Sequence, residues 1–91
     1  MYDEQAVAFT QRLDRLVSKQ REPAQRELGA LLNALEVHVE EGNGRPEIVT
    51  AFEKLFCDLA SLRKLDAKTV STAKGLLDGL RLHLHKETAG T

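Results

Sequence analysis

The sequence predicts an all-α protein: an antiparallel four-helix bundle built from two similar helical hairpins. Apolar residues recur every three or four positions along most of the chain, which is the period of an amphipathic helix. Turn signals interrupt this pattern, and the second half of the chain repeats features of the first. The 91 residues suffice for one modest core. We therefore expect a single helical domain over 1–91, with hairpin repeats at about 3–42 and 46–87.

The first helix is expected over 3–20. Asp3 and Glu4 suit the positive end of a helix dipole. Pro23 then interrupts the pattern, because proline is tolerated in the first turn of a helix but not in its interior. A second helix is therefore expected over 23–41, with one helix kinked at Pro23 as the alternative. The apolar faces comprise Tyr2, Ala6, Phe9, Leu13, Leu16 and Gln20, with Val17 beside them, and then Leu28, Leu31, Leu32, Leu35 and Val39.

The second hairpin begins after Gly42-Asn43-Gly44, the clearest helix stop in the chain. A third helix is expected over 46–64 and a fourth from an Asp66 N-cap to about residue 86, followed by a frayed tail. The third helix carries Val49, Phe52, Phe56 and Leu59, with a second stripe of Ile48, Leu55 and Leu62. The fourth carries Val70, Ala73, Leu77, Leu80 and Leu84.

An internal repeat relates the two hairpins. Residues 30–41 align with 75–86 at a constant offset of 45, and Phe9 and Leu16 align with Phe52 and Leu59 at an offset of 43. The first alignment matches Leu31/Leu76, Leu32/Leu77, Leu35/Leu80 and His38/His83. Any two leucine-rich amphipathic helices resemble each other, which is the alternative explanation. A duplicated hairpin is favoured because one hairpin cannot bury its apolar face alone, whereas two can bury each other.

Composition restricts the classes of function. The net charge is −1, which provides no general attraction to nucleic acid or anionic membrane. No apolar run approaches the length of a membrane span, and the acidic N-terminal residues do not resemble a secretory signal. A single cysteine, Cys57, cannot form an internal disulfide. Together these features predict a cytoplasmic protein.

No arrangement of residues predicts catalysis or a cofactor. His38 and His83 lie at matched positions, but the carboxylate-bundle pattern needs Glu three residues earlier, where Leu35 and Leu80 stand. We expect these histidines to lie at the margin of the core, with a metal-binding bundle as a third hypothesis. Cys57 has no histidine near it in the sequence, and no serine lies in a nucleophile elbow. We expect no enzyme activity.

The leading hypothesis is a non-enzymatic protein-interaction module: a small regulator, adaptor or chaperone-like bundle that binds a protein through helix faces. Apolar residues outside the predicted seams suggest extra buried surface, and a basic stripe on the first helix suggests an acidic partner. A homodimer is the expected oligomeric state. The candidate partner-binding residues are Arg12, Arg15, Lys19, Val37, Ile48, Leu55, Leu62 and Leu82. Solvated helix faces are the alternative explanation for the charged members.

One segment resembles a DNA-binding motif. The run Leu65-Asp-Ala-Lys-Thr-Val-Ser-Thr-Ala-Lys74 is similar to the recognition helix of the LuxR-type helix-turn-helix, and Asp58-Leu59-Ala60 to the Glu-Ile-Ala of its preceding helix. The resemblance covers about a quarter of the chain, residues 58–80. It implies a DNA-binding transcriptional regulator that contacts the duplex through Lys68, Thr69, Ser71, Thr72 and Lys74. Arg63 and Ala73 depart from the pattern of that family, and the near-neutral net charge argues against nucleic acid.

Overall fold

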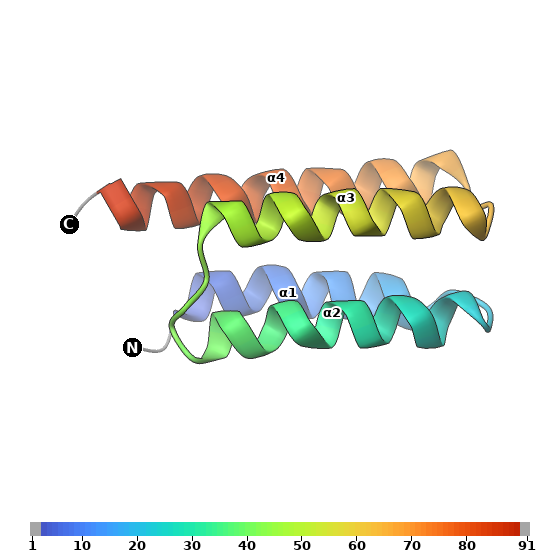
Figure 1. Cartoon of the computed structure of the whole chain (residues 1–91), viewed down its shortest axis with the longest axis horizontal. Helices are drawn as coiled ribbons and strands as arrows, with labels where there is room; N and C mark the ends of the chain where they lie inside the picture. Colours follow the sequence, from blue (N-terminus) through green and yellow to red (C-terminus); the bar gives the residue numbers. More distant parts are fainter. Residues whose placement is uncertain (1–2, 90–91) are drawn as a thin grey trace.

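Four helices lie side by side and run antiparallel to their neighbours in the computed structural model, which describes residues 3–89 and the side chains of 3–87 (Figure 1). They are α1 (Glu4–Ser18), α2 (Ala24–Glu40), α3 (Pro46–Leu62) and α4 (Ala67–Ala89). Each helix packs on two others, in the ring α1–α2–α3–α4–α1. The bundle measures 40 × 19 × 17 Å. The expected four-helix bundle is confirmed.

The helix ends follow local chemistry. Asp3 caps α1 by accepting a hydrogen bond from Ala6 N at 3.1 Å, and Asp66 accepts one from Thr69 N at 2.6 Å. Residues 19–23 separate α1 from α2, so Pro23 marks two helices and not one kinked helix. Gly42 ends the first hairpin with a φ of 77°, in the left-handed region that glycine adopts without strain.

Three helix ends differ from the sequence prediction by two residues or more, and the first is that of α1, which ends at Ser18 and not at residue 20. α3 ends at Leu62, two residues early, because Lys64 takes a left-handed φ of 56° and Leu65 N bonds back to Ala60 O at 3.0 Å. This is the same type of cap that Gly42 forms, but a lysine does not signal it. α4 continues to Ala89, three residues beyond the expected end at residue 86, and residues 90–91 of the expected frayed tail lie outside the described residues.

The core fills the space between the four helices with aliphatic side chains and two phenylalanines, Phe52 and Phe56. The seams predicted for the second and fourth helices are buried, except Leu31 and Val70, which are half-buried. The seam predicted for the first helix was partly wrong. Val7 and Thr10 are buried, whereas Phe9 and Leu16 are half-buried. Thr10 tolerates burial because its hydroxyl donates to Val7 O at 2.8 Å. Tyr2 lies outside the described residues.

Burial follows the internal repeat. With offsets of 43 for α1 to α3 and 45 for α2 to α4, most buried positions coincide in the two halves, although Val7, Thr10 and Ala24 are buried where Thr50, Glu53 and Thr69 are not. The coincident pairs are Ala6/Val49, Leu13/Phe56, Val17/Ala60, Leu28/Ala73, Leu32/Leu77, Leu35/Leu80 and Val39/Leu84. The exposed pair Val37/Leu82 coincides as well. The two hairpins are therefore related by a pseudo-two-fold, and any position in one half can be compared with its equivalent in the other.

In the part of the chain that the structure describes, no helix combines the length and apolar character needed to cross a lipid bilayer.

Candidate interaction surfaces

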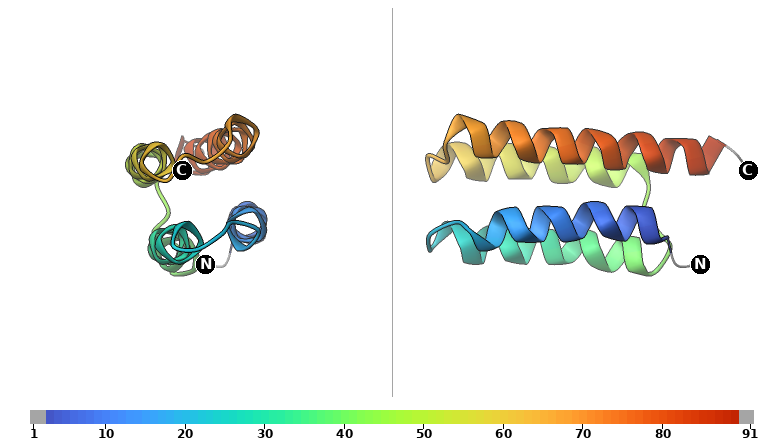
Figure 2. Two further views of the ribbon diagram at one scale, coloured as in Figure 1. Left: turned by 90° about the vertical axis from the view of Figure 1, so that its right-hand side faces the viewer. Right: turned by 180° about the vertical axis from the view of Figure 1, so that it is seen from behind.

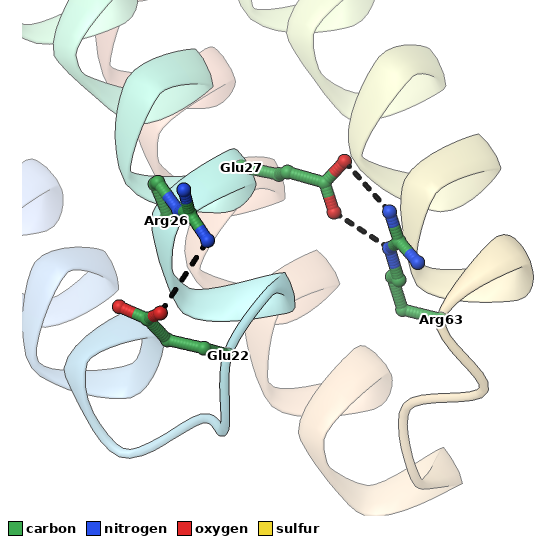
Figure 3. A network of polar contacts seen from close by, with 4 residues as sticks. All are labelled: Glu22, Arg26, Glu27 and Arg63. Atoms are coloured by element: carbon green, nitrogen blue, oxygen red, sulfur yellow. Dashed lines mark hydrogen bonds and ion pairs between the residues drawn. The ribbon is translucent and has the colours of Figure 1, made fainter.

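Ion pairs define the two flanks of α3. Next to its C-terminus, Arg63 binds the Glu27 carboxylate of α2 with two hydrogen bonds, of 2.6 and 2.9 Å (Figure 3). On the other flank, Glu53 Oε2 lies 3.6 Å from Arg81 Nη1 of α4. The bond from Arg63 lowers the pKa of the Glu27 carboxyl and raises that of the guanidinium. Glu53 therefore marks the side of α3 that faces α4, and Arg63 marks the side that faces α2.

The second stripe of α3 lies on the flank toward α2. Leu55 follows Glu53 by two residues, or about 200° of helix rotation, and Leu62 lies two turns further on. Both remain substantially exposed, Leu55 at 52% and Leu62 at 68% of their accessible area. Ile48, two turns earlier, is partly buried against the core. The stripe therefore extends from the core margin outward to solvent.

The adjacent flank of α2 is also apolar. Glu27 faces α3, and Leu31 and Ala34 follow it at spacings of four and three, which places them on the same flank. Leu31 is half-buried and Ala34 is exposed. We name this surface the α2/α3 face and define it as Leu31, Ala34, Ile48, Leu55, Leu59 and Leu62. α2 and α3 lie next to each other along their lengths (Figures 1 and 2).

The equivalent surface of the other half is basic. The offset of 43 places Arg12 at the position of Leu55, Lys19 at that of Leu62 and Gln5 at that of Ile48. Arg12 and Lys19 are exposed, and neither forms an ion pair within residues 3–87. The same bundle position thus accepts a charged side chain in one half. Equivalent positions of the bundle therefore carry leucine in one half and a basic side chain in the other.

The remaining candidates for partner binding lie elsewhere. Arg15 is exposed on α1, and Val37 and Leu82 project outward from α2 and α4 with 43% and 57% exposure. The structure therefore brings Ile48, Leu55 and Leu62 together on one surface. It places Arg12 and Arg15 on α1 and Leu82 on α4, which are the two helices that do not form this surface.

Charge is distributed unevenly along the bundle axis. One half of the bundle contains the α1–α2 and α3–α4 turns and comprises residues 12–30 and 55–75. It carries nine Lys or Arg and five Asp or Glu, whereas the rest of the chain carries four Lys or Arg and nine Asp or Glu. The overall charge of −1 thus divides into about +4 and −5. Sequence reasoning missed this asymmetry because only the antiparallel fold brings these segments to a common end.

A shallow cavity of about 370 Å³ lies at the basic end, where the two turns meet. Its lining mixes charges of both signs and includes Lys19, Arg21, Glu22, Arg63, Lys64 and Asp66. Glu22 pairs with Arg26 at 3.4 Å (Figure 3), and Arg63 is held by Glu27. Two of the charged groups that line the cavity are thus already paired.

Acidic side chains gather on the α1–α2 side. Burial raises the pKa of the Glu36 carboxyl, and the neighbouring Asp14 and Glu40 carboxylates add to the shift. This side of the bundle therefore disfavours any further negative charge.

The matched histidines have different surroundings. His83 Nε2 lies 3.0 and 2.9 Å from the two carboxylate oxygens of Asp3. Partial burial raises the pKa of Asp3, but hydrogen bonds from Ala6 and His83 outweigh it, so the net shift is downward. The pseudo-two-fold would pair the exposed His38 with position 46, which is Pro46 and has no acceptor side chain. Among the described residues, no three His, Cys, Asp or Glu side chains gather as metal ligands would.

The segment that resembles a helix-turn-helix forms an antiparallel hairpin. In that motif two helices cross at about 90–120°, whereas α3 and α4 run alongside each other (Figures 1 and 2). Lys68, Ser71, Thr72 and Lys74 are exposed, and Thr69 is half-buried. A hydrogen bond from Thr69 lowers the pKa of Asp66, which thereby caps α4 in its ionised form. The local sequence resemblance is thus accompanied by a different arrangement of helices.

Comparisons with protein-family models, with curated proteins and with solved structures found no match to this chain.

Proposed function

We propose that this chain is a non-enzymatic, cytoplasmic protein-interaction module that uses the α2/α3 face as its docking surface. One observation carries the proposal: Leu55 and Leu62 are exposed where the equivalent residues of the other hairpin are Arg12 and Lys19. A position that accepts charge in one half of the fold needs no leucine in the other half for folding. Exposed leucines repeated along one side of a helix are typical of surfaces that bind a further helix.

The role proposed is that of a small regulator or adaptor, because exposed leucines on a helix face are the feature that stands out among the described residues. Burial of Leu55 and Leu62 against a partner would supply the binding energy, and the Glu27–Arg63 pair would form part of a polar rim. A regulator of this kind acts through occupancy of its apolar face.

Site-specific photocrosslinking in the native cell tests this proposal. A benzophenone side chain at position 55 or 62 should yield a discrete crosslinked protein, whether another protein or a second copy. The matched controls carry the probe at positions 12 and 19, the equivalent positions of the first hairpin. Equal crosslinking from both pairs, or none from 55 and 62, would refute the proposal.

A further inference from the structure

We infer that the occupant of the α2/α3 face is a second copy of this chain, placed antiparallel across a two-fold axis. The inference rests on the proposed function, which assigns that face to protein binding, and it names the partner. Three features of the described residues carry it: the heptad spacing of the α3 stripe, the axial charge asymmetry and the unpaired charges beside the stripe.

The α3 stripe is self-complementary when reversed. Ile48, Leu55 and Leu62 are each seven residues apart, so an antiparallel copy centred on Leu55 places Leu55 on its own counterpart and Ile48 on Leu62 in both directions. Exposure increases from Ile48 to Leu62, so each contact at the ends joins a less exposed side chain with a more exposed one. A closed two-fold pair uses the same surface on both copies.

Charge favours the antiparallel arrangement over the parallel one. A two-fold axis across the helices places the half of about +4 on one copy over the half of about −5 on the other. A parallel pair would place like ends together, which costs free energy and slows encounter. Because the net charge is only −1, little overall repulsion opposes self-association.

Two charged side chains beside the stripe are placed to pair across the proposed dimer. Lys54 and Asp58 lie on the same side of Leu55 and are exposed, and neither forms an ion pair within residues 3–87, although they are four residues apart on α3. The antiparallel register brings Lys54 of each copy within about one helical turn of Asp58 of the other. The equivalent residues of α1 are Gln11 and Arg15, which cannot form such a reciprocal pair.

The face has the size of a weak, specific interface. α3 has 17 residues, hence a length of about 25 Å, and two helices present a width of about 20 Å. Two copies would bury roughly 1,000 Å² in projection, near the lower limit for specific interfaces. We therefore expect a weak dimer that dissociates on dilution.

Sedimentation equilibrium from 1 to 200 µM tests the pairing. The wild-type mass should rise from one chain to two, Leu55→Glu should remain at one chain, and Arg12→Glu should behave as wild type. Lys54→Glu and Asp58→Lys should each weaken the dimer about fivefold or more, and the double variant should recover most of the loss. Circular dichroism confirms that each variant folds. A one-chain mass for the wild type throughout, or a dimer unaffected by Leu55→Glu, would overturn the inference.

Disulfide trapping tests the orientation in a Cys57→Ser background. Under mild oxidation Leu55→Cys should crosslink with itself, and Leu62→Cys should crosslink with Ile48→Cys but not with itself. Self-crosslinking of Leu62→Cys would mean a parallel pair and overturn the antiparallel arrangement. If the wild type stays monomeric while the probe at position 55 captures a different protein in cells, this inference fails and the proposed function stands. If position 55 captures nothing, both fail.

Discussion

Leu55 of α3 and Arg12 of α1 occupy equivalent positions of the bundle, one apolar and half-exposed, the other charged and exposed. Seven pairs of buried core residues beneath them are matched between the halves. The two hairpins therefore differ here in a surface residue and not in a core residue. We interpret Leu55 as a residue exposed for binding.

The pseudo-two-fold predicts equal losses at two distant leucines. Leu35 and Leu80 are 2% and 0% exposed at matched positions. Leu→Ala at either should reduce the free energy of unfolding by about 2–5 kcal/mol, because a buried side chain is removed and a cavity remains. Leu82→Ala, at an exposed position, should change it by less than about 0.5 kcal/mol. Urea melts that show a large loss at only one of the two buried sites would contradict the equivalence.

Two glycines of α4 should respond oppositely to alanine. At Gly75 an added Cβ meets nothing within 4 Å, so Gly75→Ala should stabilise the helix by up to about 1 kcal/mol. At Gly79 the added carbon would lie 2.7 Å from Phe9 Cε1, so the ring must move and Gly79→Ala should be less stable than Gly75→Ala. Thermal melts compare the two variants. Equal stabilisation would mean that Phe9 does not pack on Gly79.

Asp3 should make the free energy of unfolding depend on pH in acidic solution. Its folded pKa is lowered, so its contribution is complete above the ordinary Asp value of about 3.9 and is lost as the pH falls through the folded pKa. At pH 7, Asp3→Ala should cost about 0.5–2 kcal/mol for the lost cap. Asp3→Ser keeps a capping oxygen, so it should retain part of that stability. A penalty that is unchanged at pH 2 would contradict this prediction.

The antiparallel hairpin argues against recognition of DNA through α4. α3 lies beside α4, and two adjacent helices are about 20 Å wide, too wide for a major groove of about 12 Å. We expect no salt-sensitive gel shift with genomic DNA at micromolar protein. A shift that disappears in Lys68→Ala, but not in the control Lys54→Ala, would restore the helix-turn-helix interpretation.

Periodicity predicted the helices and most of the core because burial in a bundle repeats every three to four residues. Periodicity failed at Thr10, a polar residue that is buried because its hydroxyl donates a hydrogen bond within its own helix. It also failed at Ala60, which is buried while the larger Leu59 remains half-buried. It also missed the end of α3 at Lys64, which has no glycine to mark it.

The candidate surface was only partly predictable. The sequence marked Ile48, Leu55 and Leu62 as a stripe outside the seam, but it did not distinguish them from Val37 and Leu82. Only the ion pairs to α2 and α4 show which flank of α3 the stripe occupies. The axial charge asymmetry likewise requires the antiparallel fold. Interaction surfaces combine residues distant in sequence, which local periodicity cannot reveal.

The central claim is that Leu55 and Leu62 serve binding and not folding. Urea unfolding of Leu55→Arg and Leu62→Lys below 1 µM, where association contributes little, tests it most directly. These changes install the side chains that the first hairpin carries at the equivalent positions, Arg12 and Lys19. We predict that each alters the free energy of unfolding by less than about 0.5 kcal/mol, as at other exposed sites. A loss above about 2 kcal/mol, comparable with that of Leu35→Ala, would mean that these leucines belong to the core and would contradict the account.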